Sequence, residues 1–263
     1  TTVRALAQHL NAIGWAYDRW AFYPVDEPWN TGETLIPQLR GFCTLVKAAD
    51  PKVRNYTDPA GNVCVEKIAE FRDLIDIWQP EMNLLKRDPR LLEWFRQNAK
   101  VFWAYEATGP GKDLRPLGYY RANGWLAWKF GLDGAGYWCY KGNDIWWPVR
   151  GGDWSVVYQT GDEVVPSRRW EASRDGVEDY RALHALNVAI ERAKTEGKAD
   201  VAEAAQALMD EAVENLVGRQ GQLVDEITRQ TRDYEIDFAL LSDYRVRIKD
   251  EILKLRATAA ATP

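Results

Sequence analysis

The spacing of apolar residues changes repeatedly along the first 140 residues of the chain. Stretches in which apolar residues recur every three or four positions predict amphipathic helices, and short continuous apolar runs bounded by turn residues predict buried strands. The predicted helices are Val3–Ile13, Thr34–Ala49, Val65–Leu74, Arg90–Ala99 and Pro116–Phe130. The predicted strands are a run that begins at Ala21, then Val53–Tyr56, Ile75–Trp78, Val101–Tyr105 and Gly134–Tyr140. Strands that alternate with helices in this way are typical of a parallel sheet with crossover helices.

The pattern becomes irregular after Tyr140 and then helical to the end of the chain. The irregular region contains Trp146-Trp147-Pro148 and the Gly151-Gly152 pair, and Trp146 and Trp147 could either cover a site or pack the loop down. Three helices are predicted to follow: Arg168–Glu196, capped by Ser167 and interrupted at Asp175-Gly176, then Ala199–Val217, then Asp233–Arg256. We therefore expect a barrel region over residues 1–197 and a helical C-terminal extension over residues 198–263.

Polar or aromatic residues stand at the C-terminal end of each predicted strand. They are Asp26 and Glu27, Tyr56 with Asp58, Trp78 with Gln79, Tyr105 with Glu106, and Trp138. Barrel enzymes gather their sites at this edge, and no Gly-rich phosphate loop follows any of the strands, as it would in a dinucleotide-binding sheet. We expect an α/β fold of the (β/α)8 TIM-barrel type. Five predicted strands, however, cannot close an eight-stranded barrel.

Charge and composition narrow the classes of partner. The chain has 34 basic and 39 acidic residues without a block of like charge, so neither nucleic acid nor an anionic membrane is an expected partner. No apolar run is long enough to predict a membrane span. The 13 Trp and 12 Tyr favour a carbohydrate partner, since aromatic rings stack on sugar faces. With only two His, and with Cys43, Cys64 and Cys139 far apart, we predict no metal and no cofactor.

The stretch Ala21–Asn30 is the first candidate site. An apolar run ends there in two adjacent carboxylates, Asp26 and Glu27, followed by Pro28 and Trp29. Burying a carboxylate is costly unless it is paired or protonated, so two in a row at a strand exit indicate a functional pair. The alternative is a helix-capping acid next to a solvated loop acid.

A second motif lies at the start of the long predicted helix. Its fixed positions are Pro166, Ser167, Arg169, Glu171, Arg174, Asp175, Gly176, Glu178, Asp179 and Tyr180. This segment resembles the signature of glycoside hydrolase family 123 and of its large relative, the DUF4091 group. We interpret the charges of the motif as structural, with Arg174 and Glu178 forming an ion pair at i,i+4 spacing.

The resemblance covers residues 21–183 and implies a β-N-acetylgalactosaminidase-like fold. It implies that Asp26-Glu27-Pro28 occupies the catalytic position on the fourth barrel strand. It also implies that the sequence starts near the fourth β/α unit, so that only the later units of the barrel lie in it. The first three strands would come from an N-terminal region or a second chain, or the arrangement is divergent. The resemblance further implies that the protein is secreted or periplasmic. The implied substrate is a carbohydrate with a β-linked N-acetylhexosamine.

The adjacency of the two carboxylates indicates the type of reaction. An ordinary retaining glycosidase holds its two carboxyl groups on opposite sides of the scissile bond, which neighbours on one strand cannot easily do. In substrate-assisted hydrolysis the sugar's own 2-acetamido oxygen attacks the anomeric carbon. Glu27 would then be the general acid and later the base, while Asp26 would orient the acetamido N–H and stabilise the developing positive charge.

The other strand-end residues are candidates for substrate binding. Tyr56 could donate to the acetamido carbonyl, and Tyr105 lies at the same rim. The remaining candidates are Trp78 and Trp138 as walls for the sugar ring, and Asp58 and Glu106 as ligands for its hydroxyl groups. Each aromatic residue could instead be core packing, and Asp58 could only shape the turn before Pro59.

Two other functions remain open at this point. One is a carbohydrate-binding relative without catalysis. The other is a divalent-metal hydrolase that would use the hard oxygen ligands of Asp26, Glu27, Asp58 and Glu106.

Overall fold

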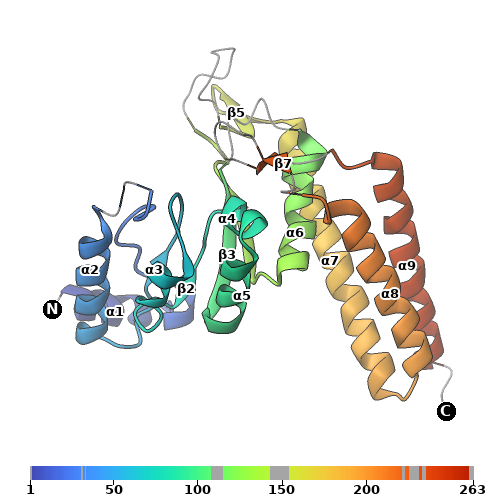
Figure 1. Ribbon diagram of the computed structural model, residues 1–263, viewed down its shortest axis with the longest axis horizontal. Coiled ribbons are helices and arrows are strands. Elements are labelled where there is room, and N and C mark those ends of the chain that lie inside the picture. The colour runs from blue at the N-terminus through green and yellow to red at the C-terminus, as the bar shows by residue number, and fades with distance from the viewer. Residues whose placement is uncertain are drawn as a thin grey trace. The chain divides into compact units, whose positions relative to one another are not determined.

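The computed structural model describes residues 2–30, 32, 34–107, 115–142, 154–220 and 235–260, together with the backbone of 223–224 and 231–232 (Figure 1). Trp146, Trp147 and the Gly151-Gly152 pair lie outside the described residues. The chain forms two compact units, residues 1–106 with 132–136, and residues 107–131 with 137–263. The predicted division after residue 197, between a barrel region and a helical extension, stays a prediction.

The first unit is built on a four-stranded parallel sheet, with the strands in the order β1-β2-β3-β4. The strands are β1 (Tyr56–Thr57), β2 (Ile77–Trp78), β3 (Val101–Glu106) and β4 (Gly134–Tyr137). Tyr56 is in register with Ile77, and Ile77 with Val101. This confirms the mixed α/β class and the parallel pairing expected from the alternating pattern.

The run that begins at Ala21 differs from the predicted buried strand. Only Phe22 pairs, in a parallel bridge with Asn55, where the Phe22 N–H donates to the Arg54 carbonyl at 2.7 Å. Pro24 has no N–H to donate, so it cannot extend the ladder. The segment nevertheless delivers Asp26 and Glu27 to the same edge of the sheet as the other strand ends.

The helices of the first unit follow the predicted order with one addition. They are α1 (Thr2–Ala12), α2 (Ile36–Ala49), α3 (Val65–Ala69), α4 (Met82–Arg87) and α5 (Pro89–Asn98), with a 3-10 turn at Tyr17–Arg19. The helix expected to reach Leu74 ends at Ala69. Helix α4 was not predicted, because all residues from Met82 to Leu85 are buried and the segment has no polar face to show a helical period.

The second unit is mainly helical. It contains a π-helical turn (Pro116–Arg121) that leads into α6 (Ala122–Phe130), and the long helices α7 (Arg168–Thr195), α8 (Ala199–Val217) and α9 (Phe238–Ala260). Figure 1 shows α7, α8 and α9 lying side by side. The Ser167 cap is confirmed, since its side chain accepts from the N–H groups of Arg169 and Trp170. None of the helices in the described part of the chain is both long and apolar enough to cross a membrane.

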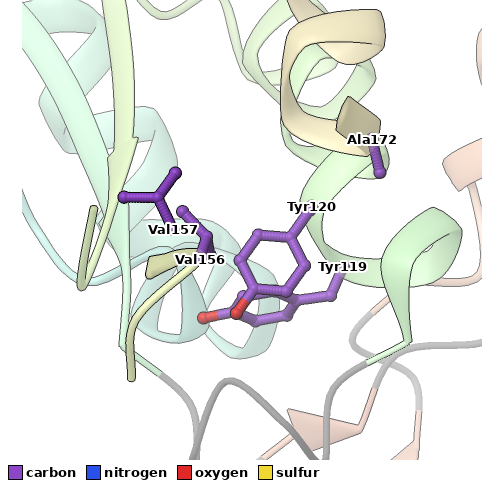
Figure 2. Close-up of a cluster of buried hydrophobic side chains, with 5 residues drawn as sticks. All are labelled: Tyr119, Tyr120, Val156, Val157 and Ala172. Carbon is purple, nitrogen blue, oxygen red and sulfur yellow. The ribbon is translucent and has the colours of Figure 1, made fainter. Parts of the chain in front are cut away.

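Two antiparallel hairpins in this unit were not predicted. They pair β5 (Val157–Thr160) with β6 (Glu163–Pro166), and β7 (Leu223–Val224) with β8 (Thr231–Arg232). For the first, the two residues Gly161-Asp162 between β-favouring runs were an available signal. Figure 2 shows Tyr119 and Tyr120 lying between the Val156-Val157 segment and the helix that carries Ala172, in one buried cluster.

Helix α7 continues through Gly176, where the sequence predicted an interruption. The glycine is needed for close packing instead: a Cβ on Gly124 of α6 would lie 2.0 Å from the Gly176 carbonyl oxygen. The two helices therefore meet backbone to backbone at this pair of glycines. Replacing either by a larger residue would force them apart.

The predicted ion pair between Arg174 and Glu178 is wrong. Arg174 pairs with Glu171 at 2.9 Å, and Glu178 lies 3.7 Å from Arg245 of α9. The interaction that fixes this part of α7 is buried instead. Arg121 donates to both oxygens of Asp179, at 2.7 and 3.1 Å, and the Trp125 indole N–H donates to the same carboxylate at 3.0 Å. Asp179, a residue of the motif, thus connects α7 to the segment Arg121–Trp125.

Candidate active site at the carboxyl end of the sheet

The carboxyl ends of the strands in the first unit carry a connected group of acidic and phenolic side chains. Parallel strands end at the same edge, so residues far apart in the sequence meet there. The group consists of Tyr23, Asp26, Glu27, Asn30, Asp58, Glu81 and Tyr105. Of these, sequence analysis had singled out Asp26, Glu27, Asp58 and Tyr105.

Glu27 is held at both carboxylate oxygens. Its Oε1 accepts a hydrogen bond from the Tyr105 hydroxyl, and its Oε2 accepts one from Asn30 Nδ2 at 2.7 Å. The Glu27 backbone has a φ of 40°, in the left-handed region that side-chain-bearing residues seldom adopt. The turn is closed by the Asn30 N–H, which donates to the Glu27 carbonyl at 2.9 Å. Non-glycine residues with positive φ cluster at functional sites, where the surrounding structure maintains the strain.

The side chain of Trp29 packs into the core and fixes the turn that contains Glu27. Its ring is 1% exposed and packs edge-on against Phe71, with the ring centroids 5.6 Å apart. Pro28 is buried next to it. Because Pro28 and Trp29 are buried, the chain immediately after Glu27 cannot move. Their packing therefore maintains the strained backbone conformation of Glu27.

Asp26 and Asp58 share one phenol. The Tyr23 hydroxyl lies in hydrogen-bond contact with Asp26 Oδ1 and, at 2.5 Å, with Asp58 Oδ2. The other oxygen of Asp58 accepts the Glu27 N–H at 3.0 Å. Asp26 is exposed, whereas Asp58 is buried. Asp58 is therefore linked to both members of the adjacent pair.

The electrostatics of the group are set by burial and by acidic neighbours. Burial raises the pKa of Asp58 to about 7, although its hydrogen bonds from Tyr23 and from the Glu27 N–H oppose that shift. Burial also raises the pKa of Glu81, and the charge of Glu27 adds to the effect. In the part of the chain that the structure describes, no Lys or Arg forms an ion pair with Asp26, Glu27 or Asp58.

The two phenols of the site stay protonated at neutral pH. Burial, and then the hydrogen bond to Asp26, raises the pKa of Tyr23. Burial, and then the hydrogen bond to Glu27, does the same for Tyr105. Both hydroxyl groups therefore act as hydrogen-bond donors toward carboxylates.

Three aromatic rings form a row beside the acidic group. Tyr23 and Tyr56 have ring centroids 4.7 Å apart, and Tyr56 and Trp103 lie 6.1 Å apart. A Cβ on Gly134 would come within 2.8 Å of the Trp103 ring, so the glycine makes room for it. Tyr23 remains 43% exposed. Partly exposed rings of this kind are suited to contact the apolar face of a sugar.

The predicted substrate-binding residues differ in whether the structure leaves them able to contact a sugar. The Tyr56 hydroxyl donates to Gln79 Oε1, so it would have to turn to reach an acetamido carbonyl. Trp78 is 0% exposed and packs against Trp94 and Phe95, with ring centroids 5.5 and 5.6 Å away. A ring without exposed surface cannot stack on a sugar, so the packing alternative holds for Trp78.

Glu106 and Trp138 do not join the acidic group. Glu106 accepts from Lys86 Nζ in an ion pair whose side chains are 1% (Lys86) and 2% (Glu106) exposed. Its carboxylate therefore neutralises a buried lysine, and this pairing argues against the predicted role as a ligand for sugar hydroxyl groups. Trp138 is 60% exposed and belongs to the second unit. Its contribution to the site stays a prediction.

The predicted set missed Tyr23, Asn30 and Glu81. All three had the signal that identified the others, because each lies within a few residues of a strand exit: Tyr23 and Asn30 flank the Asp26-Glu27 pair, and Glu81 follows Pro80. What the sequence could not indicate was which of these side chains turn toward the same point.

Neither a known protein-family model nor a curated protein matches this chain.

The cysteines and carboxylates of the described residues form no metal site. Cys43, Cys64 and Cys139 form no disulfide bonds among the described residues. Among the described residues, no group of three or more His, Cys, Asp or Glu side chains is placed to hold a metal ion. The set Asp26, Glu27, Asp58 and Glu106, which a metal hydrolase would have needed, is not assembled around one point in the described structure.

Proposed function

We propose that this protein hydrolyses β-linked N-acetylhexosaminides, with N-acetylgalactosaminides as the first candidates, by substrate-assisted retaining catalysis. The observation that supports this most directly is the pair Asp26-Glu27 at the carboxyl end of a parallel sheet, with Glu27 strained and held by Tyr105. The resemblance of residues 21–183 to glycoside hydrolase family 123 supplies the substrate class. We further propose that the sheet is part of a (β/α)8 barrel, completed by an N-terminal region or a second chain.

Asp26 is suited to the orienting role. One of its oxygens is engaged by the Tyr23 hydroxyl, and the residue is exposed, so the other oxygen can accept the acetamido N–H of a bound sugar. A fixed negative charge at this position would stabilise the oxazolinium charge that develops as the acetamido oxygen attacks the anomeric carbon.

Glu27 takes the acid and base role. It would protonate the glycosidic oxygen as the bond to the anomeric carbon breaks. In the second half of the reaction it would remove a proton from the water that opens the oxazoline. The hydrogen bond from Tyr105 fixes the direction of the carboxyl group, and the turn through Asn30 fixes its position.

The test is hydrolysis of aryl and alkyl N-acetyl-β-galactosaminides by the full chain. Glu27→Gln should lower kcat/KM by roughly 10²–10⁴-fold for an alkyl leaving group and by much less for nitrophenol, which departs without protonation. Glu93→Gln, an exposed glutamate on α5, is the matched control and should leave the rate unchanged. The corresponding 2-hydroxy glycoside should not be hydrolysed, since it has no acetamido group. Equal rates on the two sugars, or an unaffected Glu27→Gln variant, would refute the mechanism.

Sugar binding without hydrolysis is the second candidate, favoured by the aromatic row of Tyr23, Tyr56 and Trp103. Calorimetric titration with N-acetylgalactosamine separates the two. Binding that is lost in Trp103→Ala, in a protein that turns over none of the glycosides, would support this candidate over catalysis.

A further inference from the structure

The Tyr23 hydroxyl carries one proton but contacts two carboxyl groups. Asp26 Oδ1 lies on one side and Asp58 Oδ2, at 2.5 Å, on the other. A phenol can donate only one hydrogen bond. The second contact is a hydrogen bond only if one of the two carboxyl groups holds a proton and donates it to the phenol oxygen. The three groups together therefore hold two protons and one negative charge.

Burial decides which carboxyl group carries the proton. Asp58 is 7% exposed, whereas Asp26 is exposed to solvent, and desolvation disfavours the charged form of a carboxyl group. Among the described residues, the side chains that interact most strongly with Asp58 are acidic or phenolic: Asp26, Tyr23, Tyr56 and Tyr105. Glu27 contributes its backbone N–H. A pKa of about 7, raised by burial, agrees with this order.

Asp58 also reaches the second member of the pair. Its Oδ1 accepts the N–H of Glu27 at 3.0 Å, at the residue whose backbone φ is 40°. One side chain thus fixes Asp26 through Tyr23 and fixes Glu27 through its main chain.

We propose that Asp58 is a positioning residue that acts in its protonated form. Its Oδ2–H donates to the Tyr23 oxygen, the Tyr23 O–H donates to Asp26 Oδ1, and its Oδ1 accepts the Glu27 N–H. This inference rests on the proposed function for the roles of Asp26 and Glu27. In this state Asp26 keeps the only negative charge of the three groups, where the oxazolinium charge would develop. When Asp58 releases its proton to solvent, two carboxylates compete for one phenol proton and the position of Asp26 is no longer fixed.

The proton location is tested without substrate. In the full chain labelled with ¹³C at the aspartate carboxyl carbons, one carboxyl resonance should titrate near pH 7 and be missing in Asp58→Asn. In Asp26→Asn its midpoint should move to lower pH, because the charge that opposes ionisation of Asp58 is removed. A midpoint for Asp58 below about pH 5, close to that of an ordinary aspartate, would overturn the proposal whatever the activity.

The positioning role is tested on the pH profile of kcat/KM for nitrophenyl N-acetyl-β-galactosaminide. Nitrophenol departs without the Glu27 proton, so ionisation of the general acid does not shape this profile. Asn copies protonated Asp at every pH, since its amide donates to Tyr23 and its oxygen accepts the Glu27 N–H. Asp58→Asn should therefore keep the rate within about threefold and lose the fall in rate that the wild type shows above pH 7. Asp58→Ala should lose roughly a hundredfold, as misplaced catalytic groups do.

Asp73→Asn, an exposed aspartate, is the matched control and should keep the wild-type profile. An unchanged alkaline fall in Asp58→Asn would overturn the positioning role. A wild-type protein without any glycosidase activity, in which Asp58 still titrates near pH 7, would refute the proposed function but support the assignment of the proton.

Discussion

The two ends of the sheet in the first unit each bury an aspartate, and they treat it in opposite ways. At the amino end, Asp76 accepts from Lys47 at 2.6 Å, from Lys100 at 2.8 Å and from the Asn55 N–H at 2.9 Å. At the carboxyl end, the Asp58 carboxyl group forms hydrogen bonds with a phenol and a backbone N–H, and it pairs with no lysine or arginine among the described residues. The charge of Asp76 is thus compensated by two cations, whereas Asp58 has no such partner in the described structure.

The pKa values of the two residues differ accordingly. Burial raises the pKa of Asp76, but the hydrogen bonds from Lys100 and Lys47 outweigh it, and the net shift is downward. Burial raises the pKa of Asp58 to about 7, and no cation among the described residues pairs with it to oppose the shift. A buried carboxyl group without a cationic partner destabilises the folded state, and such groups are typical of functional sites. A carboxylate paired with cations at the amino end of the strands is typical of fold stabilisation.

The largest effect on stability is expected at the amino end. Asp76→Ala leaves Lys47 and the Asn55 N–H without their carboxylate, and should lower the free energy of unfolding by about 4 kcal/mol. Urea unfolding at pH 7 measures the change. Asp58→Asn, at the other end, should not be destabilising under the same conditions. Equal losses from the two substitutions would mean that the two ends do not differ in function.

The dependence of stability on pH should show the next largest effect. In the folded protein Asp58 has a pKa of about 7, against 3.8 when unfolded, so between these values the folded state holds more protons. Stability should therefore fall as the pH rises from about 4 to about 7, by up to about 4 kcal/mol for this group. Unfolding of the wild type and of Asp58→Asn across this range isolates the contribution, because the variant lacks the titrating carboxyl group. Parallel curves would contradict the raised pKa.

The smallest effect is expected for Lys100. Its side chain is 62% exposed, against 19% for Lys47, and both contact Asp76. Because solvent screens an exposed ion pair, Lys100→Met should cost less than about 1 kcal/mol in urea unfolding, and Lys47→Met should cost more. A larger loss from Lys100→Met than from Lys47→Met would show that exposure does not control the strength of these pairs.

The periodic elements could be read directly from the sequence. The helix Ala199–Val217 begins and ends where its pattern predicts, and Ser167 caps the long helix as expected. Spacing failed where a segment lacks a polar face, as at Met82–Leu85, and where a proline interrupts pairing, as at Pro24. At Met82–Leu85 tertiary contacts, which the local pattern does not contain, decided the conformation. At Pro24 the missing N–H decided it, and the count of apolar residues had overlooked this.

The candidate site divides in the same way. The sequence by itself placed Asp26, Glu27, Asp58 and Tyr105 at strand exits. A polar residue at the end of an apolar run can be recognised from the local sequence alone. Only the tertiary structure decided that Tyr105 contacts Glu27, 78 positions away, and that Tyr23 joins Asp26 to Asp58. It also decided that Lys86 neutralises Glu106 and that Trp78 lies in the core. The physical reason is that a carboxyl group takes its role from its neighbours in space, which provide or withhold solvent, cations and protons.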